Sequence, residues 1–264
     1  MVLANSSVYG PVKSWRFGQS LGIDPIGAIS TCSFNCVYCQ LGNIQQQTKK
    51  RQVFVPTEQI FSELSEVSPR AIATADVVTL SGSGEPTLAL NLAEILIMAR
   101  QITAKPVVVL TNGTLLPDLQ VQAALLEADR IAIKLDAISL ENLRRINRPV
   151  AGFNWPEIWQ AWQTFCQQYQ GQLAVQTMLL TPWDDSTQFE YICLLKRLRP
   201  AEIQLNTPIR PKAVQRILEA RGNYSPHTQP YEAVFLKPID LISLKTFGDR
   251  IFEQTGIPVR YPIF

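Results

Sequence analysis

The sequence contains few of the features that mark membrane-spanning, secreted or disordered proteins. No apolar run approaches the roughly 18–20 residues that a helix needs to cross a bilayer. Residues 1–18 lack the basic segment followed by an apolar segment that is typical of a secretory signal. The five cysteines are an odd number and are too sparse for a disulfide scaffold. These absences predict a cytoplasmic protein with no membrane partner.

A strong excess of charge is also missing. Lys and Arg number 24, Asp and Glu number 22, and the formal net charge is +2. A balance this small does not indicate nucleic acid as a partner, nor does it exclude one. Apolar residues make up 46% of the 264 residues. A chain of this size and composition buries roughly 70–75% of the surface that it exposes when unfolded, which excludes the disordered and fibrous classes.

Short β-branched runs alternate with segments of helical period along most of the chain. The runs are 28–32, 76–82, 107–113, 130–137, 173–180 and 202–208. Strands that alternate with helices of 10–15 residues pair in parallel through right-handed crossovers, so the sequence predicts an α/β fold. No shift in composition divides the chain. We therefore expect one domain with a core over about 24–208 and a C-terminal extension over about 209–264, which contains helices near 214–221 and 241–255.

Several of these runs are apolar on one side and polar on the other. Lys134 and Asp136 alternate with Ile and Leu, and Gln204 and Asn206 do the same in a later run. Helices cover both faces of an open doubly wound sheet, so its central strands are apolar on both sides. A polar face on several strands instead favours a curved sheet with a ligand-holding interior. We therefore predict a barrel or partial barrel with parallel strands.

Cys32, Cys36 and Cys39 form a C-x3-C-x2-C cluster directly after the first predicted strand. Three thiolates so close in sequence can converge on one soft metal centre. A four-iron cluster that has three cysteine ligands keeps one iron open for a substrate or cofactor. Zinc is the alternative, but its structural sites need four ligands, and the single histidine and the other two cysteines lie far away in sequence.

This cluster, with Tyr38 before its last cysteine, resembles the radical S-adenosylmethionine (SAM) superfamily. The resemblance implies a partial (β/α)6 barrel in which Cys32, Cys36 and Cys39 bind a [4Fe–4S] cluster and the open iron chelates SAM. It also implies that a one-electron reductant, such as flavodoxin or ferredoxin, reduces the cluster. SAM is then cleaved to methionine and a 5′-deoxyadenosyl radical, which abstracts hydrogen from a substrate. The sequence does not identify this substrate, which could be a small molecule or RNA.

Further segments resemble the SAM-binding parts of that superfamily. Residues 81–87 are similar to its Gly-Gly-Glu motif, with Ser83 where the family has glycine. The glycines of this segment permit close backbone approach. Other matching segments end the third and fourth predicted strands, where ligands of parallel α/β folds gather. The resemblance implies a cofactor-binding set of Tyr38, Gly84, Glu85, Thr111, Asn112, Lys134, Asp136 and Asn206.

A narrower resemblance covers residues 9–212. Residues 9–22, 32–42, 82–87 and 204–211 are similar to a subfamily of iron–sulfur oxidoreductases that is distantly similar to the wyosine-type tRNA-modifying enzymes. Those enzymes use additional cysteines for a second cluster, and no matching group exists here, so a single-cluster enzyme is the better interpretation. Two alternatives remain open, which are a non-catalytic iron–sulfur electron carrier and an RNA-binding or RNA-modifying protein.

Two other groups of residues bear on the substrate. The basic residues form two clusters, one of Arg144, Arg145 and Arg148, and one of Arg210, Lys212, Arg216 and Arg221. Both could hold the phosphates of an anionic substrate, although such clusters are more often solvated helix faces. Trp155, Trp159 and Trp162 share one helical face, which favours packing over base stacking.

Overall fold

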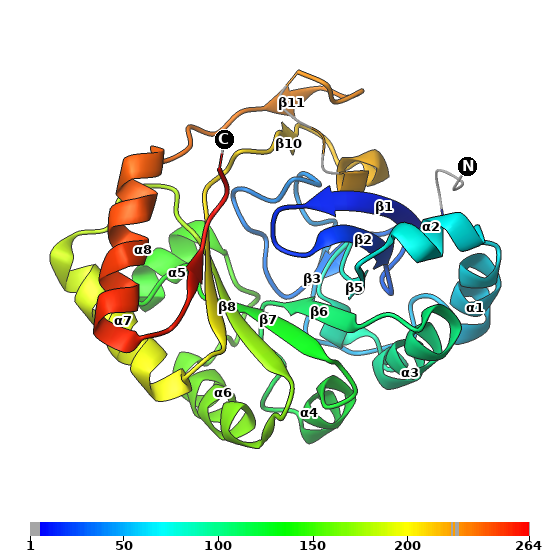
Figure 1. Ribbon diagram of the computed structural model, residues 1–264, viewed down its shortest axis with the longest axis horizontal. Helices are drawn as coiled ribbons and strands as arrows, with labels where there is room; N and C mark the ends of the chain where they lie inside the picture. The colour runs from blue at the N-terminus through cyan, green and yellow to red at the C-terminus, as the bar shows by residue number, and fades with distance from the viewer. Residues whose placement is uncertain (1–5, 223, 225–226, 264) are drawn as a thin grey trace.

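Six parallel strands curl side by side into a half-barrel in this computed structural model, which describes residues 6–222, 224 and 227–263 (Figure 1). The six strands are β2 (Gly18–Ile23), β5 (Val77–Leu80), β6 (Val107–Thr111), β7 (Arg130–Lys134), β8 (Gln172–Met178) and β9 (Glu202–Asn206). β1 (Val8–Ser14) adds an antiparallel edge beside β2, and the short β12 (Val259–Arg260) pairs with β9 at the other edge. The predicted α/β partial barrel is confirmed.

Helices cover the outer, convex side of the half-barrel (Figure 1). They are α1 (Thr57–Ser65), α2 (Pro69–Thr74), α3 (Leu92–Thr103), α4 (Leu119–Leu125), α6 (Trp155–Gln168), α7 (Asp185–Leu198) and α8 (Leu241–Thr255). The short α5 (Leu140–Ile146) instead packs on the cysteine loop, where Leu143 contacts Phe34. Their ends follow local chemistry: the side chain of Asp184 caps α7, and α8 ends at Gly256 in the left-handed conformation. Across the part of the chain that the structure describes, no helix combines the length and apolarity needed to span a membrane.

The two faces of the strands differ as the alternation predicts. Outward side chains such as Ile131, Ile133 and Val175 belong to the main apolar core under the helices. Inward side chains form a small apolar layer at the start of the strands and become polar toward the strand ends, where Lys134 and Gln176 line a cavity. The interior is therefore built to hold a ligand at the carboxyl ends of the strands.

Some predicted elements are wrong. The run 28–32 does not enter the barrel: only β3 (Thr31–Cys32) forms there, and it pairs with β4 (Gln46–Gln47) in a separate two-stranded ladder. The first barrel strand is β2 instead, which begins before the predicted core boundary near residue 24. β-Branched composition favours an extended backbone but does not select its partner, so pairing with β4 overrides the expected place in the sheet.

The C-terminal extension also differs from the prediction. A helix was expected over 214–221, but the structure has β10 (Lys212–Ala213), paired with β11 (Ala233–Val234), and a 3-10 turn, η2 (Leu218–Gly222). This segment lies against the cysteine loop: the amide of Ala213 donates to the carbonyl of Gln40, at 3.0 Å. The contacts with that loop, rather than helical periodicity, determine its conformation. The predicted helix near 241–255 is present as α8.

The turn between β1 and β2 reaches the opposite edge of the sheet. The guanidinium of Arg260, on β12, donates to the carbonyls of Trp15 and Arg16, each at 2.9 Å. Phe17 packs into the inner apolar layer with Val77 and Val108. The N-terminal hairpin thereby spans the open side of the half-barrel and presents its turn to the interior.

Candidate cofactor site

A cavity of about 300 Å³ lies at the carboxyl ends of the strands, and all three clustered cysteines line it. The loop that carries them follows β2 and crosses the mouth of the half-barrel. Of the predicted cofactor-binding residues, the following line the same cavity: Tyr38, Gly84, Glu85, Thr111, Asn112, Lys134 and Asn206. Segments that are far apart in the sequence therefore meet here.

The cysteine thiols lie within electrostatic reach of one another. Burial raises the pKa of the Cys32 thiol well above its usual value, and the neighbouring Cys36 and Cys39 raise it further. Burial likewise raises the pKa of the Cys36 thiol to about 12. Groups that are so hard to ionise alone become thiolates when a cation compensates their charge.

Nitrogen donors surround two of the sulfurs. The backbone N–H of Phe34 donates to Cys32 Sγ at 3.4 Å, and the side-chain amide of Asn112 lies 3.6 Å from the same sulfur. The amide of Asn147 donates to Cys36 Sγ at 3.3 Å. Such donors stabilise negative charge on sulfur and tune the potential of a metal–sulfur centre.

The donor set suits a cluster better than a single ion. Within the described residues, no group of three His, Cys, Asp or Glu side chains is arranged to hold one metal ion. The zinc alternative therefore lacks the closed set of ligands that it needs. An iron–sulfur cube is larger than an ion, so its cysteine ligands stand farther apart. Three half-buried cysteines that line one cavity, with nitrogen donors beside two of the sulfurs, fit this group.

The glycine-rich loop after β5 is docked on the cysteine loop. The amide of Thr31 donates to the carbonyl of Ser83, and the amide of Glu85 donates to the carbonyl of Thr31, both at 3.1 Å. A Cβ atom at Gly84 would lie 1.7 Å from the carbonyl oxygen of Thr31. Glycine is therefore required at this position by contact between the two loops.

Glu85 is buried, and its carboxylate accepts hydrogen bonds from neighbouring residues. It accepts hydrogen bonds from the hydroxyl of Thr111 at 2.6 Å, the amide of Asn112 at 2.7 Å and the hydroxyl of Thr87 at 2.8 Å. Burial raises the pKa of Glu85, while these donors lower it. The carboxylate thus fixes the end of β6, and it holds Asn112 beside Cys32.

Asp136 differs from the other predicted residues because it lies behind the cavity, in a small adjacent space. Its carboxylate accepts hydrogen bonds from the hydroxyl of Tyr38, the side-chain amide of Asn147 and the backbone of Met178. Lys134 Nζ lies 3.7 Å from this carboxylate and 5.0 Å from the centre of the Tyr38 ring. The described contacts give Asp136 a positioning role on Tyr38 and the cysteine loop.

Asn206 lies at the end of β9, across the cavity from the cysteines' own loop. Its Oδ1 atom is buried and has no hydrogen-bond partner within the described residues. A buried acceptor without a partner costs free energy, about 1–3 kcal/mol. Asn206 is therefore ready to accept a hydrogen bond from a ligand in this cavity.

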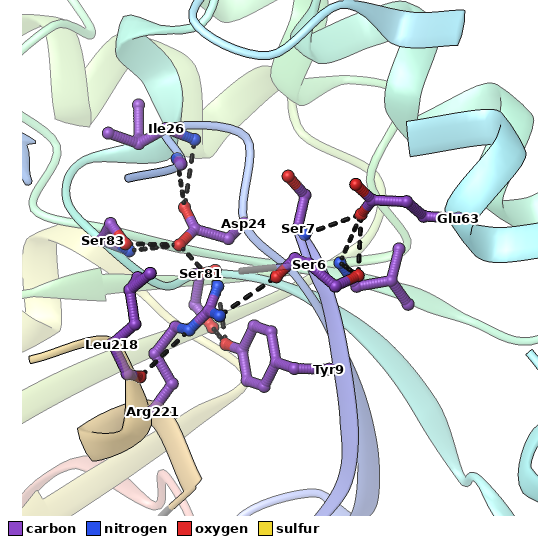
Figure 2. Close-up of polar contacts among 12 residues, drawn as sticks. Ser6, Ser7, Tyr9, Asp24, Ile26, Glu63, Ser81, Ser83, Leu218 and Arg221 are labelled. Carbon is purple, nitrogen blue, oxygen red and sulfur yellow. Dashed lines mark hydrogen bonds and ion pairs between the residues drawn. The ribbon is translucent and has the colours of Figure 1, made fainter. Parts of the chain in front are cut away.

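Sequence reasoning missed a buried network that joins the N-terminal segment to Arg221 in η2. Asp24 accepts hydrogen bonds from the amide and hydroxyl of Ser83 and forms an ion pair of 2.9 Å with Arg221 (Figure 2). Arg221 also donates to the carbonyl of Ser6 and stacks on the Tyr9 ring, 4.6 Å from its centre. The serine that replaces the family's glycine is thus a partner of Asp24, a contact that no local motif reveals.

The residues of the second basic cluster make different contacts. Arg221 is held by Asp24, Lys212 Nζ donates to the carbonyl of Val37 at 3.0 Å, and Arg216 donates to the hydroxyl of Ser83 at 2.8 Å. Arg210 lines the cavity. The first cluster, Arg144, Arg145 and Arg148, is exposed on and just after α5.

The tryptophans and the remaining cysteines lie in the helical layer. The rings of Trp155, Trp159 and Trp162 contact one another, and Trp162 Nε1 donates to the carbonyl of Gly113 at 2.9 Å. Packing, as predicted, is their role. Cys166 lies on α6 and Cys193 on α7, and neither lines the cavity of the cysteine cluster as described.

Together these features define a cofactor-binding half-barrel in which a cysteine loop and a glycine-rich loop meet at the carboxyl ends of the strands. A model of the radical SAM superfamily matches residues 28–187, and the chain belongs to this superfamily. Membership indicates that the protein is an enzyme.

The curated relatives of the chain include UPF0026 proteins. The chain is 52% identical over 257 residues to a UPF0026 protein of Synechocystis sp., a match that covers 96% of this chain and 95% of the relative. It is 34% identical over 206 residues to a UPF0026 protein of Methanocaldococcus jannaschii, covering 77% of this chain and 64% of that relative.

Solved structures support the fold. SuiB of Streptococcus suis bound to S-adenosylmethionine is similar, with a TM-score of 0.61 and 13% identity over 92% of this chain. A radical SAM methyltransferase from Sphaerobacter thermophilus gives a TM-score of 0.60 and 15% identity. This chain spans 50% of the length of SuiB and 65% of that of the methyltransferase. At these identities the likeness concerns the fold alone.

Proposed function

We propose that this protein is a radical SAM enzyme in which Cys32, Cys36 and Cys39 bind a [4Fe–4S] cluster. When bound, the cluster supplies one electron for the reductive cleavage of SAM, and the resulting 5′-deoxyadenosyl radical abstracts hydrogen from a substrate. A one-electron donor such as flavodoxin or ferredoxin would reduce the cluster. We also retain as proposals the cytoplasmic location and the division into a core and an extension near residue 209.

The residues of the chain have distinct tasks in this proposal. Asn112 and Asn147 donate toward the cysteine sulfurs and hold them in position. Gly84 and its neighbours present backbone groups toward the bound cofactor. Asn206 offers its buried acceptor to a hydroxyl or amine of SAM. Lys134 lines the cavity and carries a positive charge, which opposes the negative charge of the thiolates.

One observation supports the proposal most strongly. The loop that carries the cysteines and the loop that carries Gly84 and Glu85 are joined by two backbone hydrogen bonds, and both line one cavity. An electron carrier needs a closed cluster and no room beside it. A cavity of about 300 Å³ beside three cysteines instead favours a cluster with an open iron that meets a small molecule.

Anaerobic reconstitution with iron and sulfide tests the proposal. The reconstituted protein is expected to contain four irons, and after reduction it should convert SAM to 5′-deoxyadenosine. Addition of SAM to the reduced protein should also perturb its electron paramagnetic resonance signal, because an open iron is available. If the electron paramagnetic resonance signal does not change when SAM is added, the protein is an electron carrier and the proposal is wrong.

A further inference from the structure

Arg16 presents a guanidinium to the same cavity from the turn between β1 and β2. The turn is held on two sides: Phe17 packs into the inner apolar layer, and Arg260 binds the backbone carbonyls of Trp15 and Arg16. The guanidinium carbon lies 5.4 Å from the centre of the Trp15 ring. The position of Arg16 is therefore determined by the fold.

Arg16 lacks a counter-charge. Within the described residues it makes no ion pair, and its Nε atom is buried without a hydrogen-bond partner. Burial, and after it the positive charge of nearby Arg210, lower the pKa of Arg16 to about 9. Burying the charge of Arg16 without a counter-charge is unfavourable, unless a ligand compensates it.

The other charges of the cavity have their own partners. Lys134 faces Asp136, Arg221 pairs with Asp24, and the carboxylate of Glu85 accepts four hydroxyl and amide donors. None of these groups is left to neutralise Arg16. An oxyanion would do so, because the planar guanidinium binds two oxygens of a phosphate or carboxylate at once.

We propose that Arg16, with Arg210 beside it, binds the phosphate or carboxylate group of a small-molecule substrate. The inference rests on the proposed function for what happens to that substrate, but anion binding is measurable without SAM cleavage. A cavity of about 300 Å³ is at the small end of the range for small-molecule sites. Contact with the backbone of a long RNA instead needs an exposed basic surface, and Arg16 is not part of one.

Calorimetric titration of the reconstituted, unreduced protein tests the assignment. The two probes are inorganic phosphate and succinate, and the one that binds more tightly assigns the oxyanion. Arg16→Met should weaken binding at least tenfold, because it removes the charge and the paired donors but keeps most of the side-chain length. Arg70→Met, at an exposed position on α2, is the matched control and should bind like the wild type.

A second variant guards against a folding defect. Arg16→Lys keeps the charge but loses the planar pair of donors, so we expect at least threefold weaker binding. If Arg16→Met does not fold, Arg16→Lys decides the question, and unchanged affinity in that variant overturns the proposal. Equal binding by wild type and a folded Arg16→Met, or no binding of either probe by the wild type, also overturns it.

Two further measurements separate competing ligands. If saturating SAM displaces the probe competitively, Arg16 serves SAM itself and the substrate assignment is wrong. If an RNA oligonucleotide with a 5′-hydroxyl binds through Arg16 while phosphate and succinate do not, the ligand is RNA and the proposal fails. Probe binding without formation of 5′-deoxyadenosine by the wild type leaves the anion site intact and rejects the proposed function. Formation of 5′-deoxyadenosine by a wild-type protein that binds neither probe rejects only the anion site.

Discussion

Gly84 lies directly against the carbonyl group of Thr31, so closely that a Cβ atom at Gly84 would stand 1.7 Å from that oxygen. The contact joins the loop after β5 to the strand that carries Cys32. The resemblance to the superfamily implies that this glycine binds the cofactor. In the structure it also permits two backbone hydrogen bonds between the loops that build the cavity.

Gly84→Ala should therefore damage the site even before any cofactor binds. The added methyl group forces the two loops apart and breaks both hydrogen bonds with Thr31. Overpacking and the lost bonds together predict a loss of about 2–4 kcal/mol in the free energy of unfolding. Calorimetry should show a melting temperature lower by about 4–16 °C, at roughly 2–4 °C for each kcal/mol. Iron content after reconstitution should fall as well.

The matched control is Gly248→Ala, within α8. The atoms nearest to a Cβ at Gly248 would be side-chain atoms of Tyr261 and Val259, the closest at 3.3 Å, and these can shift. Alanine is the better helix former, which offsets the tighter contact. If Gly248→Ala and Gly84→Ala have the same melting temperature, close contact between the loops does not explain why glycine is needed at position 84.

Replacing the clustered cysteines one at a time tests the metal site. Cys32→Ser, Cys36→Ser and Cys39→Ser should each reduce iron after reconstitution to a small fraction of the wild-type content, since two thiolates hold a cube poorly. Cys166→Ser is the control, because Cys166 packs on the core from α6. Iron and sulfide analysis provides the measurement. Full iron content in any of the three cluster variants would remove that residue from the ligand set.

The inner face of the barrel was predictable because strand geometry alone determines it. Alternation along a strand assigns Lys134 and Gln204 to one face and their apolar neighbours to the other, whatever the rest of the chain does. The sequence therefore predicted both the half-barrel and the end of the strands where the cavity lies. Proximity in sequence likewise predicted the cysteine cluster.

Other parts of the site depend on contacts between distant segments, which no local pattern encodes. Arg221 follows Asp24 by nearly two hundred residues, yet they pair at 2.9 Å. Arg16 reaches the cavity because the hairpin turns back across the sheet. Asp136 shares a face with Lys134 in sequence, but Tyr38 and Asn147 draw its carboxylate behind the cavity. Tertiary contacts between distant segments determine where these side chains lie.

Asp136→Ala should destabilise the protein strongly. It would leave the hydroxyl of Tyr38 and the backbone N–H of Met178 without their acceptor, and the amide of Asn147 would keep its longer contact with Cys36 Sγ, at a cost of about 3–5 kcal/mol. Urea unfolding measures the change. Asp185→Ala, whose carboxylate is 91% exposed in its ion pair with Arg250, should leave the free energy of unfolding almost unchanged. Equal effects of the two variants would contradict the positioning role of Asp136.

Arg221→Met should release the C-terminal extension from the cofactor site. The substitution removes the ion pair with Asp24 and the hydrogen bond to Ser6, while Asp24 keeps the amide and hydroxyl of Ser83 as donors. The loss should therefore fall near the low end for a broken buried pair, about 3 kcal/mol.

Local opening of residues 209–222 should become more frequent in this variant, so their amide hydrogens should exchange faster than in the wild type. The amide of Ala213 is the most informative probe, because it donates to Gln40 in the cysteine loop. Arg250→Met, which breaks a more exposed pair on α8, is the control and should leave this exchange unchanged. If exchange at residues 209–222 is the same in all three proteins, the ion pair does not hold the extension, and the contacts of β10 and η2 with the cysteine loop must suffice. Faster exchange confined to Arg221→Met would instead show that the ion pair between Arg221 and the distant Asp24 keeps the extension packed on the cysteine loop.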